Sequence, residues 1–175
     1  MTSDSSLGGG KQSFDPLDPR LDVTTPLKPS SAAAAIVVVD NRYLLQHRDN
    51  KRGIFFPGHW CCFGGAVEAG ETPEQGLIRE LHEEIGLTLQ PGTARYFSRL
   101  DYDLGFTGLG TLWRYYYEVK LEPDGLDRLR LGEGSAMRLF TPAEILTASV
   151  QFTPYDAFML WFHINRARLH EAGSG

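Results

Sequence analysis

The pattern of apolar and polar positions along the chain predicts a series of short β-strands. Apolar runs rich in β-branched or aromatic residues are bounded by turn signals such as Asp40-Asn41 and Pro57-Gly58. We expect strands over residues 35–39, 43–47, 60–63, 95–102, 112–121 and 137–140. The glycine-rich stretch 104–110 would then form a flexible hairpin loop between the two longest strands.

A different spacing of apolar residues predicts a helix in the middle of the chain. Thr72 can act as its N-cap, Pro73 suits the first helical position, and Gln75 completes a capping box. Gly86 closes the helix as a left-handed C-terminal residue. One face of this helix is apolar and is formed by Leu77, Ile78, Leu81 and Ile85.

Further helices are expected over residues 142–146 and 153–169. The second would pack onto the sheet through its apolar residues, which are Phe158, Leu160, Trp161, Phe162 and Ile164. Strands on both sides of a central helix, followed by a terminal helix, indicate an α/β fold with a mixed sheet between helices. Residues 1–30 are rich in Ser, Gly and Pro and lack periodicity, so they predict a flexible tail before a folded domain of residues 31–172.

The composition narrows the class of protein. A chain of 175 residues with 42% hydrophobic and 22% charged residues fits one globular domain with a sizeable core. A net charge of −5 without a long basic run gives no support for a nucleic-acid partner. No apolar run approaches a membrane span, and the first residues lack the apolar core of a signal peptide. We therefore expect no membrane association and a cytoplasmic location.

The only two cysteines, Cys61 and Cys62, are adjacent. Adjacent cysteines exclude a disulfide framework, and the chain has no second pair for a zinc site. We interpret them as small apolar residues of a buried strand, with a reactive thiol as the alternative.

A cluster of acidic residues carries the candidate chemistry. The segment Gly65–Leu87 reads GAVEAGETPEQGLIRELHEEIGL, and Glu80, Glu83 and Glu84 share one arc of the expected helix. Like charges at this spacing destabilise a helix, so either the face is simply solvated or a cation sits on it. A divalent cation held by carboxylates is a typical partner of phosphate groups, and Arg79 could brace these carboxylates as a bidentate donor.

The same segment resembles the Nudix box, G-x5-E-x7-R-E-U-x-E-E-x-G-U, where U is an aliphatic residue. Every defined position is filled, namely by Gly65, Glu71, Arg79, Glu80, Leu81, Glu83, Glu84, Gly86 and Leu87. The resemblance identifies the chain as a MutT-like member of the Nudix hydrolase superfamily. It implies an α/β/α sandwich over roughly residues 32–169 and hydrolysis of a phosphoanhydride bond.

The resemblance also implies roles for individual residues. The expected ligands of Mg²⁺ or Mn²⁺ are Glu80, Glu83 and Glu84, with Gly65 letting the loop close over the metal. Arg79 would orient these glutamates, and Glu71 and Gly86 would support the site. Family members often recruit a further acidic residue from a later loop, and the candidate here is Glu133, in the stretch LGEGS. The general base stays open between Glu80 and Glu133, and the catalytic set comprises Arg79, Glu80, Glu84 and Glu133.

The sequence gives weaker signals for the residues that bind the substrate. Phe55, Phe56 and Trp60 could stack on a nucleobase, although core packing is the alternative for each. Arg48, Arg99 and Arg114 lie near expected strand ends and could pair with phosphates, with an ordinary surface charge as the alternative.

We expect a metal-dependent hydrolase that cleaves the pyrophosphate of a nucleoside diphosphate linked to another moiety, with a nucleotide sugar or similar conjugate as the leading substrate. One alternative is a nucleoside triphosphate pyrophosphohydrolase of the MutT type. The other is a non-catalytic regulatory domain that binds nucleotides. Dimers are common in the family, so a homodimer is compatible with the resemblance.

Overall fold

The computed structural model describes residues 29–105, 108 and 110–172. The expected flexible tail falls outside these residues except for its last two positions, and part of the expected hairpin loop falls outside them as well. Within the described ranges, no helix is long and apolar enough to cross a membrane.

The strands form one seven-stranded mixed sheet in the order β3-β2-β1-β6-β5, with β4 pairing β1 and β7 pairing β2. The strands are β1 (Ala32–Val39), β2 (Arg42–His47), β3 (Trp60–Cys61), β4 (Phe63–Ala66), β5 (Arg95–Asp103), β6 (Thr111–Lys120) and β7 (Ala136–Phe140). The pairing of β1 with β6 is parallel, and the other ladders are antiparallel. The expected mixed sheet is confirmed.

The sheet is split on one side of β1. Residues 32–35 of β1 pair with β4, whereas residues 37–39 pair with β2. The strands β2 and β4 therefore diverge from a common neighbour, and a gap opens between them. This gap matters because the acidic helix lies beside it.

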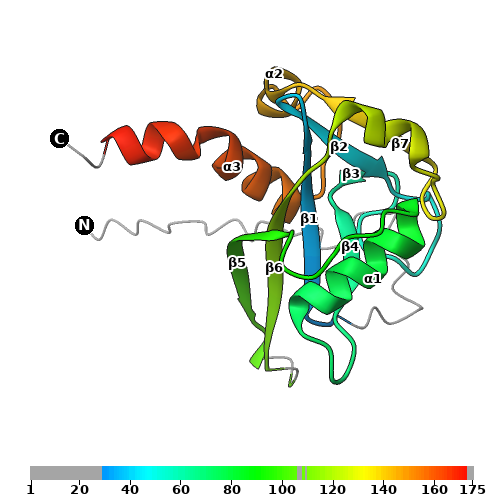
Figure 1. Ribbon diagram of the computed structural model, residues 1–175. Coiled ribbons are helices and arrows are strands. Elements are labelled where there is room, and N and C mark those ends of the chain that lie inside the picture. Colours follow the sequence, from blue (N-terminus) through cyan, green and yellow to red (C-terminus); the bar gives the residue numbers. More distant parts are fainter. Residues whose placement is uncertain (1–28, 106–107, 109, 173–175) are drawn as a thin grey trace, which may run out of the picture.

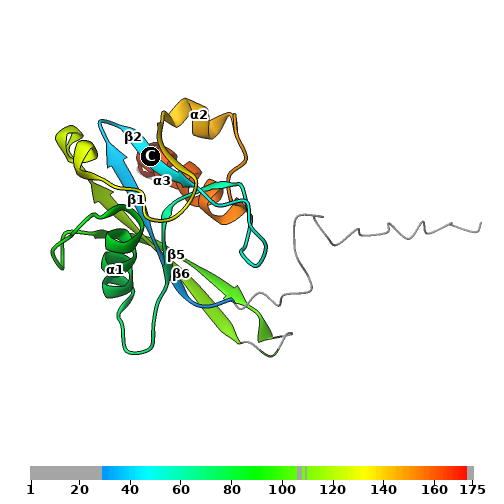
Figure 2. The same ribbon diagram turned by 90° about the vertical axis from the view of Figure 1, so that its right-hand side faces the viewer.

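Helices cover both faces of the sheet, as Figure 1 and the turned view in Figure 2 show. The helix α1 (Pro73–Ile85) packs on one face with a core that includes Leu77, Leu81 and Phe63. The helices α2 (Pro142–Leu146) and α3 (Pro154–Ala172) cover the other face with a second core. The result is the expected α/β/α sandwich. A short 3-10 helix, η2 (Pro123–Arg128), lies between β6 and β7 and was not expected.

The local signals of α1 are confirmed. Thr72 and Gln75 form the capping box, and Gly86 adopts the left-handed conformation with φ of 68°. Of the apolar face, Leu77, Leu81 and Ile85 are fully buried.

Two of the expected strands differ from the structure by more than one residue. The strand β1 begins at Ala32 rather than residue 35, because its alanines pair with β4 and β6 although alanine has a low intrinsic preference for strands. The expected strand 60–63 is broken into β3 and β4 at Cys62. The reason is that the Cys62 backbone N–H donates to Asp156 Oδ2, 3.1 Å away, instead of to a neighbouring strand.

The packing of α3 also differs in part. Leu160 is fully buried, but Phe158 and Trp161 are about half exposed and stack on each other outside the core. The expectation that both aromatic residues pack on the sheet was wrong, because only one face of the helix contacts it. Cys61 and Cys62 are buried as expected, and burial raises the pKa of the Cys61 thiol to about 12.

Candidate active site

Glu84 lies at the gap between β2 and β4, and its carboxylate contacts both sides. Gln46 of β2 donates from Nε2 to Oε1 at 2.7 Å, and the backbone N–H of Gly64 in β4 donates to Oε2 at 2.7 Å. Only 5% of Glu84 is exposed. This burial, helped by the neighbouring carboxylates of Glu80 and Glu133, raises the pKa of Glu84 to about 7. A carboxylate held this way is poised to exchange a proton or to bind a cation.

Arg79 gathers the other carboxylates of the segment. Its Nε donates to Glu71 at 2.9 Å, and its Nη1 donates to Glu80 at 2.8 Å and to Glu83 at 3.3 Å. Its Nη2 donates to Glu71 and to the carbonyl of Ala66. The hydrogen bonds from Arg79 lower the pKa of Glu71, so this carboxylate stays ionised. The guanidinium thereby ties the loop before α1 to the helix.

Gly65 leaves room for Glu80. A Cβ atom added to Gly65 would lie 2.5 Å from the carboxyl carbon of Glu80, far inside van der Waals contact. A residue with a Cβ atom at this position would therefore displace the Glu80 carboxyl group. Burial raises the pKa of Glu80, against the opposing effect of Arg79.

The later loop brings Glu133 to the same place as Glu84. The backbone N–H of Gly132 donates to the Glu84 carbonyl at the end of α1 at 2.7 Å, and the N–H of Ser135 donates to the His47 carbonyl at 2.9 Å. These two bonds fasten the loop on either side of Glu133. Together with Gln46 and Glu84, Glu133 lines a small cleft of about 60 Å³. The juxtaposition expected from the family pattern is present.

The carboxylates fit a hard divalent cation in their chemistry, because such ions prefer oxygen ligands. Within residues 29–105, 108 and 110–172, however, no group of three or more His, Cys, Asp or Glu side chains is already arranged to hold one. The contacts explain this: Glu80 and Glu83 face Arg79, and both oxygens of Glu84 accept hydrogen bonds.

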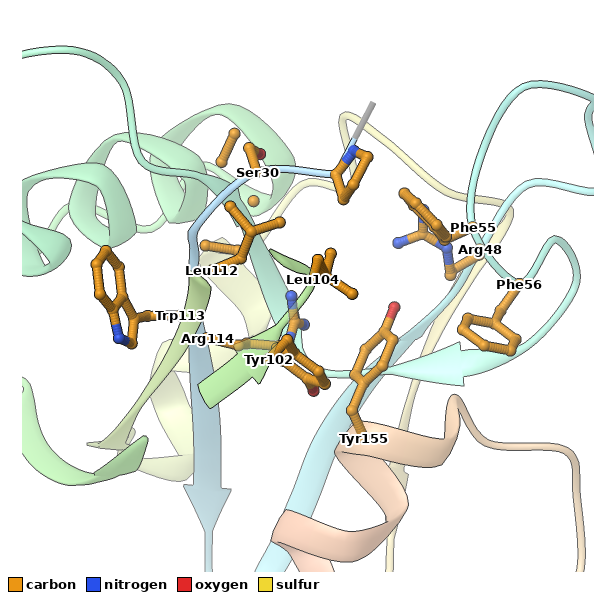
Figure 3. Close-up of a pocket in the computed structure, with 15 residues that line it drawn as sticks. Ser30, Arg48, Phe55, Phe56, Tyr102, Leu104, Leu112, Trp113, Arg114 and Tyr155 are labelled. Carbon is orange, nitrogen blue, oxygen red and sulfur yellow. The ribbon is translucent and has the colours of Figure 1, made fainter. Parts of the chain in front are cut away.

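A larger cavity of about 520 Å³ lies next to this acidic cleft (Figure 3). Gly64 and the first glycine of the box, Gly65, line it. Its other walls are mostly apolar and include the aromatic residues Phe55, Phe56, Tyr102, Trp113 and Tyr155. Arg48 lines both the large cavity and the acidic cleft. Its Nε is buried and has no hydrogen-bond partner among the described residues.

A buried ion pair forms one wall of the large cavity. Arg114 of β6 donates from Nη2 to Asp156 Oδ1 at 3.2 Å, and its guanidinium lies 4.6 Å from the centre of the Tyr155 ring. Asp156 is fully buried and also accepts from the hydroxyl groups of Tyr116 and Thr153.

Of the six residues expected to contact substrate, the structure brings Arg48, Phe55, Phe56 and Arg114 to the large cavity. Trp60 and Arg99 line neither cavity. Trp60 packs against Phe140, with ring centres 4.9 Å apart, so core packing is its observed role. Arg99 pairs with Asp101 at 2.7 Å on an exposed part of β5.

Sequence reasoning missed Gln46 and Tyr102. Gln46 is a buried polar residue inside the apolar run of β2, and a polar side chain in such a run is a signal that could have revealed it. Tyr102 had no comparable signal, because its place in the cavity depends on the pairing of β5 with β6.

Comparison with known proteins agrees with this geometry. The model of the NUDIX domain matches residues 29–162, so the chain belongs to the NUDIX family and is a member of the Nudix hydrolase superfamily. Over 55 residues it is 44% identical to the nucleoside triphosphatase NudI of Enterobacter sp. (strain 638), a stretch that covers 31% of this chain and 38% of the relative. NudI of Escherichia coli O139:H28 is 49% identical over 47 residues, which are 27% of this chain and 33% of the relative. The chain thus spans little more than a third of these curated relatives.

Solved structures share the fold. The solution structure of the E. coli ORF135 protein matches with a TM-score of 0.60 and 27% identity, over 81% of this chain and 94% of that one. The MutT NUDIX hydrolase of Burkholderia pseudomallei matches with a TM-score of 0.60 and 22% identity, over 76% and 96% of the chains. The NUDIX domain of Shewanella oneidensis NrtR, complexed with ADP ribose, matches with a TM-score of 0.60 and 17% identity, over 85% and 93%.

Proposed function

We propose that this protein is a metal-dependent pyrophosphohydrolase whose domain comprises residues 31–172. The observation that carries the proposal is the position of Glu84. Its buried carboxylate lies at the gap in the sheet, close enough to Glu80 and Glu133 for each to raise its pKa. Carboxylates gathered in this way are candidate ligands for a divalent cation, and the complete Nudix box supports this interpretation.

Mg²⁺ or Mn²⁺ would be held by Glu80, Glu83, Glu84 and Glu133, with Gly65 in the loop beside them. When bound, such an ion neutralises phosphate charge and lowers the pKa of a bound water. Arg79 keeps Glu71 ionised and holds the loop against α1, whereas Gly86 ends the helix directly after the glutamates. Glu80 and Glu133 are the candidates for accepting a proton from the attacking water.

The leading substrate is a nucleoside diphosphate linked to another moiety, such as a nucleotide sugar. The large cavity supports this choice, because about 520 Å³ lined by aromatic side chains suits a base and its attached group. Arg48 is placed to contact the diphosphate, since it lies between the large cavity and the acidic cleft. The binding of ADP ribose by the NrtR domain is in line with a conjugate of this kind.

A nucleoside triphosphate is the second candidate, favoured by the similarity to the NudI triphosphatases over the box. A purely regulatory role is the third. It is disfavoured because Glu80, Glu83 and Glu84 are all present and the loop of Glu133 is fastened beside them.

The test is to incubate the protein with Mg²⁺ or Mn²⁺ and nucleotide sugars, dinucleotides or nucleoside triphosphates, and to measure phosphate-bearing products. We expect turnover of at least one diphosphate conjugate. Glu84→Gln should reduce turnover by several orders of magnitude, whereas the exposed control Glu122→Gln should keep it. Near-normal turnover of Glu84→Gln would contradict the metal assignment. Ligand-induced shifts in Tm without any turnover would favour the regulatory role.

A further inference from the structure

The charged side chains that line the large cavity are all basic. Its charged side chains are Arg48 and Arg114, and among the described residues that line it none is acidic. The carboxylate that pairs with Arg114, Asp156, is fully buried and accepts hydrogen bonds on both oxygens. A ligand in this cavity therefore meets guanidinium donors and no carboxylate acceptor.

Arg114 is held in one orientation. Its Nε donates to Tyr116 at 3.0 Å, and both Nε and Nη2 donate to Asp156. These bonds leave Nη1 without an acceptor among the described residues. Figure 3 shows the guanidinium of Arg114 between Tyr102 and Tyr155, with the hydroxyl of Tyr155 extending into the cavity. An immobilised guanidinium with donors to spare is a preformed recognition group for acceptor atoms.

The two arginines occupy different parts of the site. Arg48 also lines the acidic cleft with Glu84 and Glu133, so it lies on the side where the phosphates would be. Arg114 lines only the large cavity, and β1 separates its strand from β4. The group that reaches Arg114 is therefore the part of the substrate remote from the reacting phosphates, and the aromatic walls around it suit a flat ring.

We propose that Arg114 reads the carbonyl edge of a nucleobase, so that the cavity selects oxo bases over their amino counterparts. This inference rests on the proposed function, because it names the base of the same substrate. A carbonyl oxygen of uracil or hypoxanthine accepts from the guanidinium, whereas the amino group of cytosine or adenine at the same ring position is itself a donor. Two donors facing each other would leave both unsatisfied in a buried place.

Asp156 is the positioning residue of this recognition. It neutralises Arg114 and holds the guanidinium plane beside Tyr155, and it reaches Arg114 from the first turn of α3. Without it Arg114 would no longer be held in this orientation. The carbonyl preference would then be lost even if the cavity kept its shape.

The test compares matched pairs of nucleoside monophosphates that differ at one ring position. Dissociation constants of IMP and AMP, and of UMP and CMP, are measured by calorimetry on the full chain. We expect each oxo member to bind roughly tenfold more tightly, which is the discrimination that one good arginine–base contact gives. Arg114→Met removes every donor at this position and keeps a long side chain, so it should reduce the preference below about threefold. The exposed control Arg128→Met should leave it unchanged.

Amino members that bind as tightly as their oxo partners to the unaltered chain would overturn the inference, whatever the variants do. A preference that persists in folded Arg114→Met would overturn the assignment to Arg114. Asp156→Asn should weaken the preference while the affinity for inorganic pyrophosphate is kept, because that ligand has no base. These binding measurements do not require turnover. A carbonyl preference without hydrolysis would thus reject the proposed function alone, and hydrolysis without a preference would reject this inference alone.

Discussion

Gln46 and Glu84 join the two sides of the split sheet. The Gln46 amide donates to Glu84 at 2.7 Å from β2, while the Gly64 N–H holds the other carboxylate oxygen from β4. The carboxylate at the centre of the candidate site is thus oriented by residues outside α1, the helix that carries it. The spacing of glutamates along α1 does not by itself fix this orientation.

Replacing Gln46 should weaken the site without unfolding the protein. In Gln46→Leu the side chain keeps a similar volume but becomes apolar, so Glu84 loses the hydrogen bond that stabilises its ionised form. We expect the pKa of Glu84 to rise further above about 7, and Mn²⁺ affinity and turnover to fall roughly tenfold to a hundredfold. Metal titration and kcat/KM measure these effects. The exposed control Gln90→Leu should behave like the unaltered protein, and an unchanged metal affinity in Gln46→Leu would contradict the positioning role.

Adding one methyl group at Gly65 should displace Glu80. The Cβ of Gly65→Ala would collide with the Glu80 carboxyl group, which must then leave its place beside Arg79. We predict a loss of turnover of at least about a hundredfold, as expected for misplacement of a group at the reacting centre. Thermal unfolding should change little, because Glu80 is a side chain that can turn outward. In Gly105→Ala the added atom faces only the Asp103 carboxylate at 3.0 Å, so equal losses in both variants would argue against the steric explanation.

The metal-free protein should become less stable as pH rises through the titration of Glu84. The folded-state pKa of about 7 lies above the ordinary value of 4.5, so the folded protein holds this proton more tightly than the unfolded chain. Between these two values the stability falls with pH, by a total of the order of 3 kcal/mol. Urea unfolding in EDTA from pH 5 to pH 8 measures this loss. Glu84→Gln cannot titrate at this position and should show a flatter profile, and identical slopes would refute the assignment.

Removing Asp156 alone should destabilise the folded protein, because it leaves the buried Arg114 without its counter-charge. We expect Asp156→Ala to lower the free energy of unfolding by about 3–5 kcal/mol, as for other broken buried pairs. The double variant Asp156→Ala, Arg114→Met removes the unpaired charge and should recover a large part of this loss. Urea unfolding of the two single variants and the double variant gives the coupling energy. Additive effects would show that the pair does not act as a unit.

How far the sequence predicts the structure depends on the range of the interactions. The helix α1 was predicted from Thr72 to Gly86 because its caps and apolar face are local signals. The break between β3 and β4 was not, because it depends on the bond from Cys62 to Asp156, which is distant in the sequence. The same limit applies to two arginines: the sequence did not reveal that Arg114 lines the cavity and that Arg99 does not. The face that each occupies is fixed only by the register of β5 against β6.

The two faces of the sheet hold separate cores, one beneath α1 and one beneath α2 and α3. The effects of distant substitutions on the free energy of unfolding are generally additive. Substitutions in one core should therefore have little influence on the effect of substitutions in the other. The helix α1 depends on the first core. The cavity wall formed by Arg114 and Asp156 depends on the second core. Over evolutionary time, descendants of this chain could exchange one ligand for another by altering α3 and β6 alone. The proposed hydrolytic chemistry would then be retained.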